Sequence, residues 1–330
     1  MVRFGLLGAG RIGKLHGNNI VASPDAELVA VADVVAEAAT ALAEATGAEA
    51  RSAEAIINGD DIDAILIGTS TDTHADFIEQ AMAAGKAVLC EKPVDLDAGR
   101  IETCLKAVEP TGRPLMVGFN RRFDPNFASL KKRLDDGAVG SVEMVTIISR
   151  DPGPPPVSYI ERSGGLYRDM MIHDFDMARF LLGEEPVEVH AVGSVLVDPA
   201  IGAAGDVDTA MVMLRTASGK LCQISCSRRA TYGYDQRIEV HGSGGMIRAG
   251  NLHETTVELA TGGGFTADPV MNFFLERYGA AYRLELAAFI DAVENGTPTS
   301  PSGHDGLMAQ RLADAATKAR ETGQPVNPTA

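Results

Sequence analysis

Short apolar runs and helical segments alternate along the first 120 residues of the chain. The apolar runs predict strands at 2–7, 27–32, 64–67, 87–89 and 115–117. The segments between them predict helices that begin near residues 11 and 35 and helices at 53–58, 73–84 and 96–107. Repeated strand–helix units imply a parallel sheet with helices on both faces. We therefore expect a doubly wound α/β domain over residues 1–120.

The pattern changes after residue 120. A helix is predicted up to about residue 134, a strand at 142–149, a rigid proline loop at 151–156, and a helix from about residue 167 to 182. Strand-like segments follow at 187–197, 207–216, 220–229, 234–241, 245–249 and 254–260, and helices at 273–294 and 304–321. Strands joined by glycine turns indicate an open, mostly antiparallel sheet. Residues 121–330 are expected to form an α+β domain with one sheet face left for ligands or a partner subunit.

A glycine loop, GAGRIG, follows the first predicted strand and opens the first predicted helix. Gly8 permits the tight turn, Gly10 lets the backbone approach a pyrophosphate, and Gly13 permits close helix–strand packing. The positive end of the helix then faces the phosphates. The dinucleotide-binding residues expected from this loop are Gly8, Gly10, Arg11, Ile12 and Gly13.

An acid ends the second predicted strand. Asp33 lies 20 residues after Gly13, where a carboxylate is expected to bind the adenosine ribose. The alternative is a helix N-cap, because aspartate caps well and a helix follows. Val34 and Val35 offer no cation for a 2′-phosphate, so the expected cofactor is NAD rather than NADP.

Polar residues follow two further strands, where ligands bind in such sheets. They are Thr69, Ser70, Thr71 and His74 after one strand, and Glu91 and Lys92 after the next. We expect all six to lie near the cofactor, with His74 lining or capping that site rather than reacting. Lys92 is either a solvated loop lysine or a group held in a rigid turn by Pro93, whose peptide isomer the sequence leaves open.

The segment GGLYRDMMIHDFDMARFL, residues 164–181, combines apolar residues with an acid and an imidazole. Asp169 and His173 are four residues apart and would share one face of an α-helix. A carboxylate and a titratable ring in a buried setting are costly unless they are paired or used. His173 suits a general base near neutral pH, and Asp169 would orient it.

Charge and targeting signals narrow the function class. The net charge of −16 argues against a nucleic-acid partner and against an anionic membrane surface. We find neither a signal peptide nor an apolar run long enough to span a membrane, and expect a cytoplasmic protein. Cys222 and Cys226 lack a second pair of ligands, so no metal site is expected and the four cysteines suit reduced thiols.

Several motifs together resemble the Gfo/Idh/MocA oxidoreductases, in the inositol 2-dehydrogenase branch. They are GAGRIG, Glu91-Lys92-Pro93, GFNRRFDP at 118–125, HDFDMARFL at 173–181 and VDPAIGAAGDVDTA at 197–210. The resemblance implies a Rossmann domain, an α+β domain whose open sheet pairs subunits, usually into a homotetramer, and NAD-dependent oxidation of myo-inositol to 2-keto-myo-inositol (scyllo-inosose). A related dehydrogenase for scyllo-inositol or an aldose, and a non-catalytic NAD-binding sensor, are the alternatives.

The resemblance also implies site residues. It assigns a catalytic triad to Lys92, Asp169 and His173, in which Lys92 would stabilise the developing alkoxide. Polyol contacts would fall on Asn120, Arg121, Asp151, Tyr232 and Tyr234. Tyr232 and Tyr234 flank Gly233 at the start of a predicted strand, where the alternation of an extended chain places both side chains on one face. Asn120 replaces an apolar residue of some members, and Asp151 stands where an asparagine is often found. Both departures lie in the expected polyol pocket.

Overall fold

The computed structural model describes residues 1–328, which group by contacts into two units. Unit 1 comprises Met1–Asn120 and Tyr282–Gln310, and unit 2 comprises Arg121–Ala281 and the chain from Arg311 onward. The division expected from the sequence, 1–120 and 121–330, differs from this grouping in the segment 282–310. That segment returns to the edge of the first sheet, where the Val117 amide donates to the Pro301 carbonyl at 3.1 Å.

Unit 1 contains a six-stranded sheet in the order β3-β2-β1-β4-β5-β6, with every pair parallel. Its strands are β1 (Val2–Leu7), β2 (Ala26–Ala32), β3 (Glu49–Ala50), β4 (Ala64–Ile67), β5 (Ala87–Cys90) and β6 (Leu115–Val117). From β1 the sheet grows in two opposite directions: β2 and β3 are added on one side, and β4, β5 and β6 on the other. The switch point therefore lies between β1 and β4. Such a switch point is where open parallel sheets bind ligands. The predicted Rossmann-type sheet is confirmed, with the two-residue β3 as an addition.

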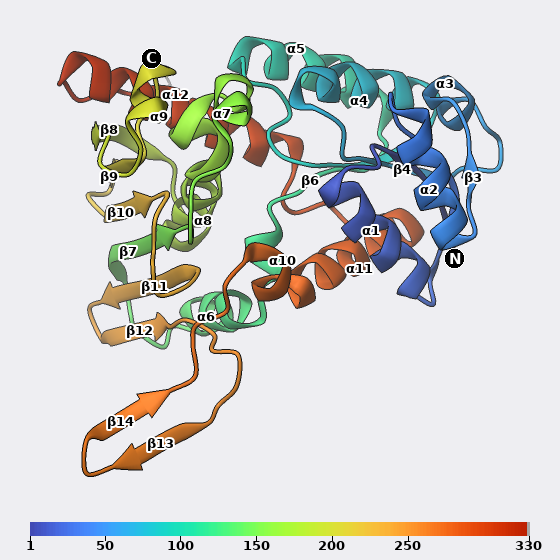
Figure 1. Cartoon of the computed structure of the whole chain (residues 1–330). Coiled ribbons are helices and arrows are strands. Elements are labelled where there is room, and N and C mark those ends of the chain that lie inside the picture. Colours follow the sequence, from blue (N-terminus) through green and yellow to red (C-terminus); the bar gives the residue numbers. More distant parts are fainter. Residues whose placement is uncertain (329–330) are drawn as a thin grey trace. The chain divides into compact units, whose positions relative to one another are not determined.

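The helices of unit 1 connect these strands. They are α1 (Arg11–Ala22), α2 (Ala36–Thr46), α3 (Ala53–Ile57), α4 (His74–Ala83) and α5 (Ala98–Val108), together with most of α11 (Gly279–Asn295) and the start of α12 (Gly303–Thr322). α4 and α5 lie side by side, and Arg100 of α5 pairs with Asp76 and Glu79 of α4 (Figure 1). Short 3₁₀ turns occur at Thr71–Thr73, Glu109–Thr111 and Asn120–Phe123.

Unit 2 contains the second sheet, in the order β12-β11-β7-β10-β9-β8. Its strands are β7 (Val142–Arg150), β8 (Pro186–Ser194), β9 (Thr209–Thr216), β10 (Leu221–Ser227), β11 (Asp235–Gly242) and β12 (Gly245–Ala249). All neighbours are antiparallel except β7 and β10, which are parallel. The mostly antiparallel α+β fold is therefore confirmed. The central pair can be parallel because no hairpin joins β7 to β10: helices and the strands β8 and β9 lie between them in the chain.

The helices of unit 2 leave one face of its sheet uncovered. They are α6 (Pro125–Asp135), α7 (Val157–Ser163), α8 (Ile172–Leu182), α9 (Pro199–Ala203), α10 (Phe274–Arg277) and the end of α12. α8 packs on β7 and β10, and α6 packs beside β12, on the same side of the sheet (Figure 1). The sequence patterns did not predict α7 and α9, because each has fewer than two turns and shows little periodicity.

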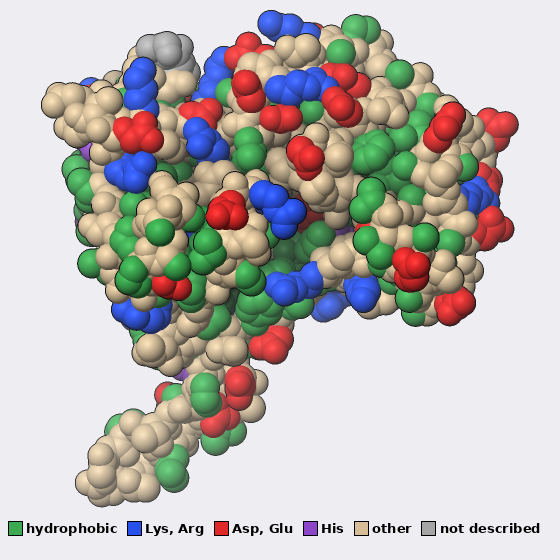
Figure 2. Space-filling view, turned by 45° about the horizontal axis from the view of Figure 1, so that its top comes forward, with side chains coloured by type: hydrophobic (Ala, Val, Ile, Leu, Met, Phe, Trp, Pro, Cys, Tyr) green, Lys and Arg blue, Asp and Glu red, His purple; other side chains and the backbone are tan. Residues whose placement is uncertain are grey.

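A hairpin outside the main sheet replaces the last predicted strand of the meander. β13 (Glu258–Thr261) and β14 (Gly264–Ala267) pair only with each other. The hairpin extends away from the sheet of unit 2 (Figure 1, Figure 2). All eight of its residues are exposed, and Phe265 is 81% exposed. The prediction that 254–260 joins the main sheet was therefore wrong, since no alternating residue of β13 faces a core.

The helix expected from residue 167 is not one regular α-helix. Leu166–Met170 forms a π-helical turn in which the Met171 amide donates to the Leu166 carbonyl at 2.9 Å, and α8 begins only at Ile172. Asp169 therefore lies in the π turn and His173 in the α-helix. The expected i to i+4 geometry of a single α-helix was wrong for this pair, because an i to i+5 turn changes the direction of the side chains.

Among the described residues, no helix is both long enough and apolar enough to cross a membrane. The face shown in Figure 2 carries both basic and acidic side chains.

Glu285 is a fully buried acid on α11 in unit 1. Neither of its carboxyl oxygens has a hydrogen-bond partner among the described residues. Burial raises the pKa of Glu285 well above its usual value, and the nearby Glu91 carboxylate raises it further. Burial therefore favours the neutral, protonated form of Glu285 in the folded protein.

We expect Glu285→Gln to remove a pH-dependent loss of stability. In the unfolded chain this acid ionises near its ordinary pKa, whereas the folded chain retains the proton to higher pH. The free energy of unfolding of the native protein should therefore fall relative to that of the variant as pH rises above the ordinary pKa, by up to about 1.4 kcal/mol per pH unit. Urea unfolding at pH 5, 6.5 and 8 measures this, with the exposed Glu44→Gln as control. A pH-independent difference would contradict the assignment.

Candidate functional site

The glycine loop of unit 1 is shaped by close backbone contacts. Gly8 has a φ of +103°, and a Cβ there would overlap the Gly68 carbonyl; a Cβ at Gly13 would overlap the Gly8 carbonyl. A Cβ at Gly10 would meet nothing within 4 Å, so it would project into the open space above the loop. No side chain caps the first turn of α1. The loop and helix end fit a dinucleotide pyrophosphate, which takes its hydrogen bonds from such backbone groups.

Asp33 ties the end of β2 to this loop. Its Oδ2 accepts the Ala9 amide at 2.6 Å, and its Oδ1 accepts the Val35 amide at 2.8 Å. The N-cap of α2 is Val35, so the alternative of Asp33 as the N-cap was wrong. Val34 is fully exposed and Val35 is 53% exposed. A carboxylate followed by two apolar side chains suits a ribose with free hydroxyls rather than a 2′-phosphate.

His74 links the segments that follow β4 and β5. Its Nδ1 lies 2.8 Å from the Pro93 carbonyl oxygen, and its Nε2 lies 3.2 Å from the Thr69 carbonyl oxygen. Only 2% of the residue is exposed, and burial lowers its pKa. The same segment is tightened by a 2.7 Å hydrogen bond between the hydroxyls of Thr69 and Thr73. Through these contacts His74 stabilises the two segments. The expected contacts of His74, Ser70 and Thr71 with the cofactor stay predictions.

The Glu91-Lys92-Pro93 turn is anchored on its Glu91 side. The Glu91 Oε1 lies 2.8 Å from Nε2 of His16, which is buried in α1. The Lys92–Pro93 peptide bond is cis. Lys92 itself is partly exposed at the carboxyl edge of the sheet. The structure thus favours the rigid turn over a fully solvated lysine.

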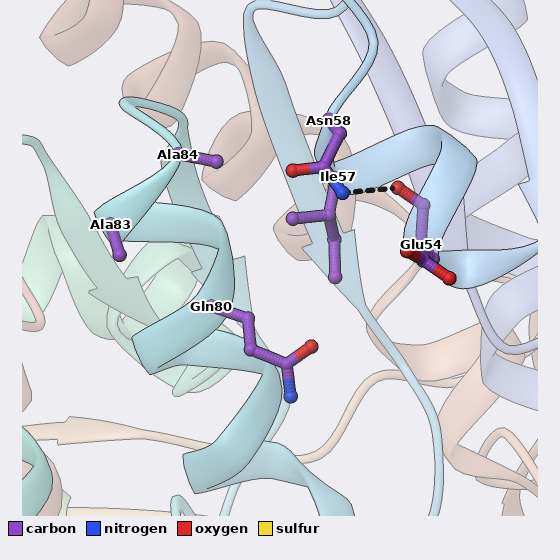
Figure 3. Close-up of a pocket in the computed structure, with 6 residues that line it drawn as sticks. All are labelled: Glu54, Ile57, Asn58, Gln80, Ala83 and Ala84. Atoms are coloured by element: carbon purple, nitrogen blue, oxygen red, sulfur yellow. Dashed lines mark hydrogen bonds between the residues drawn. The ribbon is translucent and has the colours of Figure 1, made fainter.

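A pocket of unit 1 lies on the side of the same sheet where the strands begin, opposite their carboxyl ends. It is lined by Glu54, Ile57, Asn58, Gln80, Ala83 and Ala84, from α3 and α4 (Figure 3). These residues are at the ends of helices that return to the amino ends of the strands. None of the candidate residues lines this pocket, and the fold places ligands at the other edge.

Asp169 of unit 2 is held by two other side chains. Its Oδ1 accepts the Tyr159 hydroxyl at 2.9 Å, and its Oδ2 lies 3.6 Å from Nη2 of Arg228. His173 lies in the first turn of α8 and is partly exposed. Tyr159 and Arg228 were not singled out in the sequence, because neither lies in a motif and only the fold brings them to Asp169.

Asp151 follows β7 at the start of the proline loop. Its amide donates to the Ser227 carbonyl at 2.9 Å. Burial raises the pKa of the Asp151 carboxyl to about 7, against the lowering effect of Arg228. A carboxyl that holds its proton up to neutral pH can donate one hydrogen bond as well as accept, so it can take over part of the hydrogen bonding of an asparagine amide, which has two N–H donors.

Arg121 takes part in a buried ion pair. Its guanidinium donates to Asp174 and, at 3.3 Å, to the Ser149 hydroxyl. Asp174 is fully buried and was missed in the sequence, where it reads as one more helix residue. The expected polyol contact of Arg121 stays a prediction, as does that of Asn120, which is buried at the start of a 3₁₀ turn.

Tyr232 and Tyr234 do not present their side chains together. Tyr232 is 49% exposed and donates to Asp235 at 2.6 Å, whereas Tyr234 is 6% exposed and packs edge-on against Tyr278. Gly233 between them has a φ of +121°, which breaks the extended alternation that we expected. A Cβ at Gly233 would lie 2.7 Å from the Val270 carbonyl oxygen, so this turn requires glycine. The prediction of one shared face was wrong.

Comparison with known proteins identifies the family. Residues 2–119 match the oxidoreductase family with the NAD-binding Rossmann fold, and residues 131–327 match the C-terminal alpha/beta domain of the same family. The chain belongs to the Gfo/Idh/MocA oxidoreductase family. The resemblance noted in the motifs is confirmed, and so is NAD as the expected cofactor, whereas the part of the glycine loop in binding it stays a prediction.

The chain is also similar to individual members of the family. It is 60% identical over 317 residues to an inositol 2-dehydrogenase of Rhizobium meliloti (strain 1021), covering 96% of each chain. It is 37% identical to the NAD(+)-dependent scyllo-inositol 2-dehydrogenase of Bacillus subtilis (strain 168), covering 98% of this chain and 96% of that one. A crystal structure of a myo-inositol dehydrogenase from Corynebacterium glutamicum superposes with a TM-score of 0.95 at 46% identity, covering 99% and 98% of the two chains.

We expect Asp33→Ala to reduce the preference for NAD over NADP. The change removes the carboxylate that is placed for the ribose hydroxyls and also frees the Ala9 amide. The KM for NAD should rise at least about tenfold, since a hydrogen bond to a charged group contributes about 1.5–3 kcal/mol, and the KM for NADP should change less. Steady-state kinetics with both cofactors measures the ratio. An unchanged ratio would overturn the ribose assignment.

Proposed function

We propose that the chain is an NAD-dependent inositol 2-dehydrogenase that oxidises myo-inositol to 2-keto-myo-inositol (scyllo-inosose). The observation that carries the proposal is the 60% identity, over 96% of each chain, to a protein named inositol 2-dehydrogenase. The glycine loop with Asp33 and the match to an NAD-binding domain support the cofactor. NAD, when bound, supplies the hydride acceptor that oxidation of a carbinol needs.

The residues of the chain would handle the proton and the charge. We assign His173 as the general base that removes the hydroxyl proton and Asp169 as the group that orients and stabilises the protonated ring. We assign Lys92 to the reacting oxygen, where its ammonium would stabilise the developing alkoxide. The anchored Glu91-Lys92-Pro93 turn supports a fixed position for the Lys92 backbone.

The polyol contacts remain assigned to Asn120, Arg121, Asp151, Tyr232 and Tyr234. Asp151 is the best supported of these, because its protonated form can donate one hydrogen bond as well as accept, as the amide at this position in other members also can. The other four residues are either hydrogen-bonded to side chains of unit 2 or deeply buried. They would contact the substrate through polar atoms that these internal contacts do not use. Fixed polar groups of this kind reject substrates that lack a hydroxyl.

A sibling activity on scyllo-inositol is the second candidate. It is favoured by the similarity to the Bacillus subtilis scyllo-inositol 2-dehydrogenase and by the departures at Asn120 and Asp151. An aldose substrate has no such observation in its favour. A non-catalytic sensor is disfavoured because Lys92, Asp169 and His173 are all present.

Initial rates on myo-inositol, scyllo-inositol, D-chiro-inositol and glucose, each with NAD and with NADP, test the proposal. The highest kcat/KM is expected for myo-inositol with NAD. Lys92→Ala and His173→Ala should each lower kcat by about 10²–10⁴, the usual contribution of a positioned acid or base. A preference for another substrate would replace the proposed function, and near-normal turnover in either variant would refute the triad.

We further propose that the enzyme is a homotetramer that acts in myo-inositol catabolism in the cytoplasm. The four cysteines are buried and unbridged, which suits a reducing compartment. The uncovered face of the sheet in unit 2 supports self-association. Its exposed apolar side chains lie on neighbouring strands: Val192, Met211, Met213, Leu221 and Met144. An apolar face of this extent is typical of an interface.

The double variant Met211→Glu, Met213→Glu should dissociate the tetramer. Two carboxylates in the centre of an apolar interface would lose hydration without gaining a partner. Light scattering coupled to size exclusion measures the mass, and Leu284→Glu, an exposed apolar position of unit 1, is the control. A tetramer mass in the double variant, or a monomeric native protein, would contradict the proposal.

A further inference from the structure

Arg228 is a buried cation among carboxylates in unit 2. It follows β10 directly and is 1% exposed. Its Nη2 lies 3.6 Å from Oδ2 of Asp169 and 3.7 Å from Oδ2 of Asp206. Among the described residues, no acceptor lies within hydrogen-bond reach of Nε or Nη2, so charge is what holds these groups together here. A buried charge of this kind is costly unless it is compensated.

Asp206 connects Arg228 to the start of the π turn. Both of its carboxylate oxygens accept the Leu166 amide, at 3.1 and 3.0 Å. A Cβ at Gly165, where φ is +84°, would lie 2.7 Å from Oδ1 of Asp206, so only glycine lets the carboxylate approach. Leu166 is the first residue of the turn that carries Asp169. One guanidinium therefore contacts Asp169 directly and the beginning of its turn through Asp206.

The backbone around Arg228 fixes its position. The Arg228 amide donates to the Asp208 carbonyl at 2.8 Å, and the preceding Ser227 carbonyl accepts the Asp151 amide at 2.9 Å. The Asp208 carboxylate in turn accepts the amides of Leu196 and Val197, each at 2.8 Å. Arg228 is thus held by an ordered loop and does not depend on Asp169 for its place.

The charge of Arg228 also acts on Asp151. Arg228 is the largest influence that lowers the pKa of Asp151, while burial and then Asp169 raise it. Arg121 and Asp174 face the same carboxyl and have smaller, opposite effects. Removal of the Arg228 charge would raise the pKa of Asp151 above its present value of about 7. It would also take this cation away from the carboxyl groups of Asp151, Asp169 and Asp206.

We propose that Arg228 is a positioning residue for the reaction assigned above: its guanidinium holds Asp169 and, through Asp206, the π turn that carries it. The inference rests on the proposed function, since Asp169 is there the partner of the base. It adds a residue that lies outside every motif of the sequence and that acts through Asp169 and Asp206.

Three variants test this role in the full-length protein. Arg228→Met removes the charge, Arg228→Lys keeps the charge on a shorter side chain, and Arg277→Met is the matched control. Arg277 is equally buried in unit 2 but pairs with Asp124 at the start of α6. For each variant we would measure kcat, the KM values for myo-inositol and NAD, the melting temperature and the pH dependence of kcat/KM.

Arg228→Met should lower kcat about 100-fold, the scale of loss for a misplaced catalytic group, with the KM for NAD unchanged. In its kcat/KM profile the ionisation that belongs to Asp151 should move to higher pH; this ionisation is identified as the one that the Asp151→Asn variant lacks. Arg228→Lys should restore the position of that ionisation but only part of kcat, because the ammonium of the shorter side chain would not reach the position of Nη2 beside Asp169 and Asp206. Arg277→Met should lower the melting temperature and leave both kcat and the pH profile of the folded enzyme unchanged.

The inference is overturned if folded Arg228→Met keeps kcat within threefold of the native enzyme, or if Arg277→Met reproduces its kinetic changes. If Arg228→Met does not fold, Arg228→Lys and Asp206→Asn decide, and normal kcat and pH profile in both would refute the role. A native enzyme without inositol dehydrogenase activity refutes the proposed function instead. Because the activity of the native enzyme is measured first, a failure of the proposed function is distinguished from a failure of the role of Arg228.

Discussion

The nucleotide half depends on backbone atoms that approach closer than side chains would allow. At the carboxyl ends of β1, β2 and β4, Gly8 lies against Gly68 and Gly13 lies against Gly8. Asp33 then reaches the Ala9 amide across the same gap. A methyl group at Gly8 or Gly13 would push the strands or α1 apart, so the tight loop, the start of α1 and the place of Asp33 rest on one steric condition.

That condition is visible in the sequence, which is why the first half of the fold was predictable. A glycine pattern after an apolar run and an acid 20 residues later are local signals with a physical meaning. The strands of unit 1 were predictable for the same reason, since strands buried on both faces are apolar throughout. β3 escaped notice because its two residues are exposed and carry no pattern.

Unit 2 was harder to predict because its site depends on distant pairings. The parallel contact between β7 and β10, and the buried pairs of Arg121 with Asp174 and of Arg228 with Asp169, join segments that are tens of residues apart. In the sequence, a charged residue next to apolar ones is predicted to lie on the exposed face of a helix, and only the fold shows that these residues are buried. The π turn was hidden as well, because Asp169 and His173 match α-helical spacing whether or not the hydrogen bonds follow it. Gly233 had a comparable effect on the two tyrosines, since one left-handed residue reverses an alternation.

The return of residues 282–310 to unit 1 has a consequence for how the chain is made. The edge of the first sheet at β6 is completed by Thr299 and Pro301, and α11 supplies the buried Phe289 beside Phe4. On the ribosome the N-terminal strands therefore wait for these contacts while all of unit 2's strands emerge, roughly 10–40 s at 5–20 residues per second. Through that interval Phe4 and β6 lack part of their native cover. Contacts of such high sequence separation form slowly, so the apolar surface of unit 1 around Phe4 and β6 stays exposed until the C-terminal part of the chain arrives.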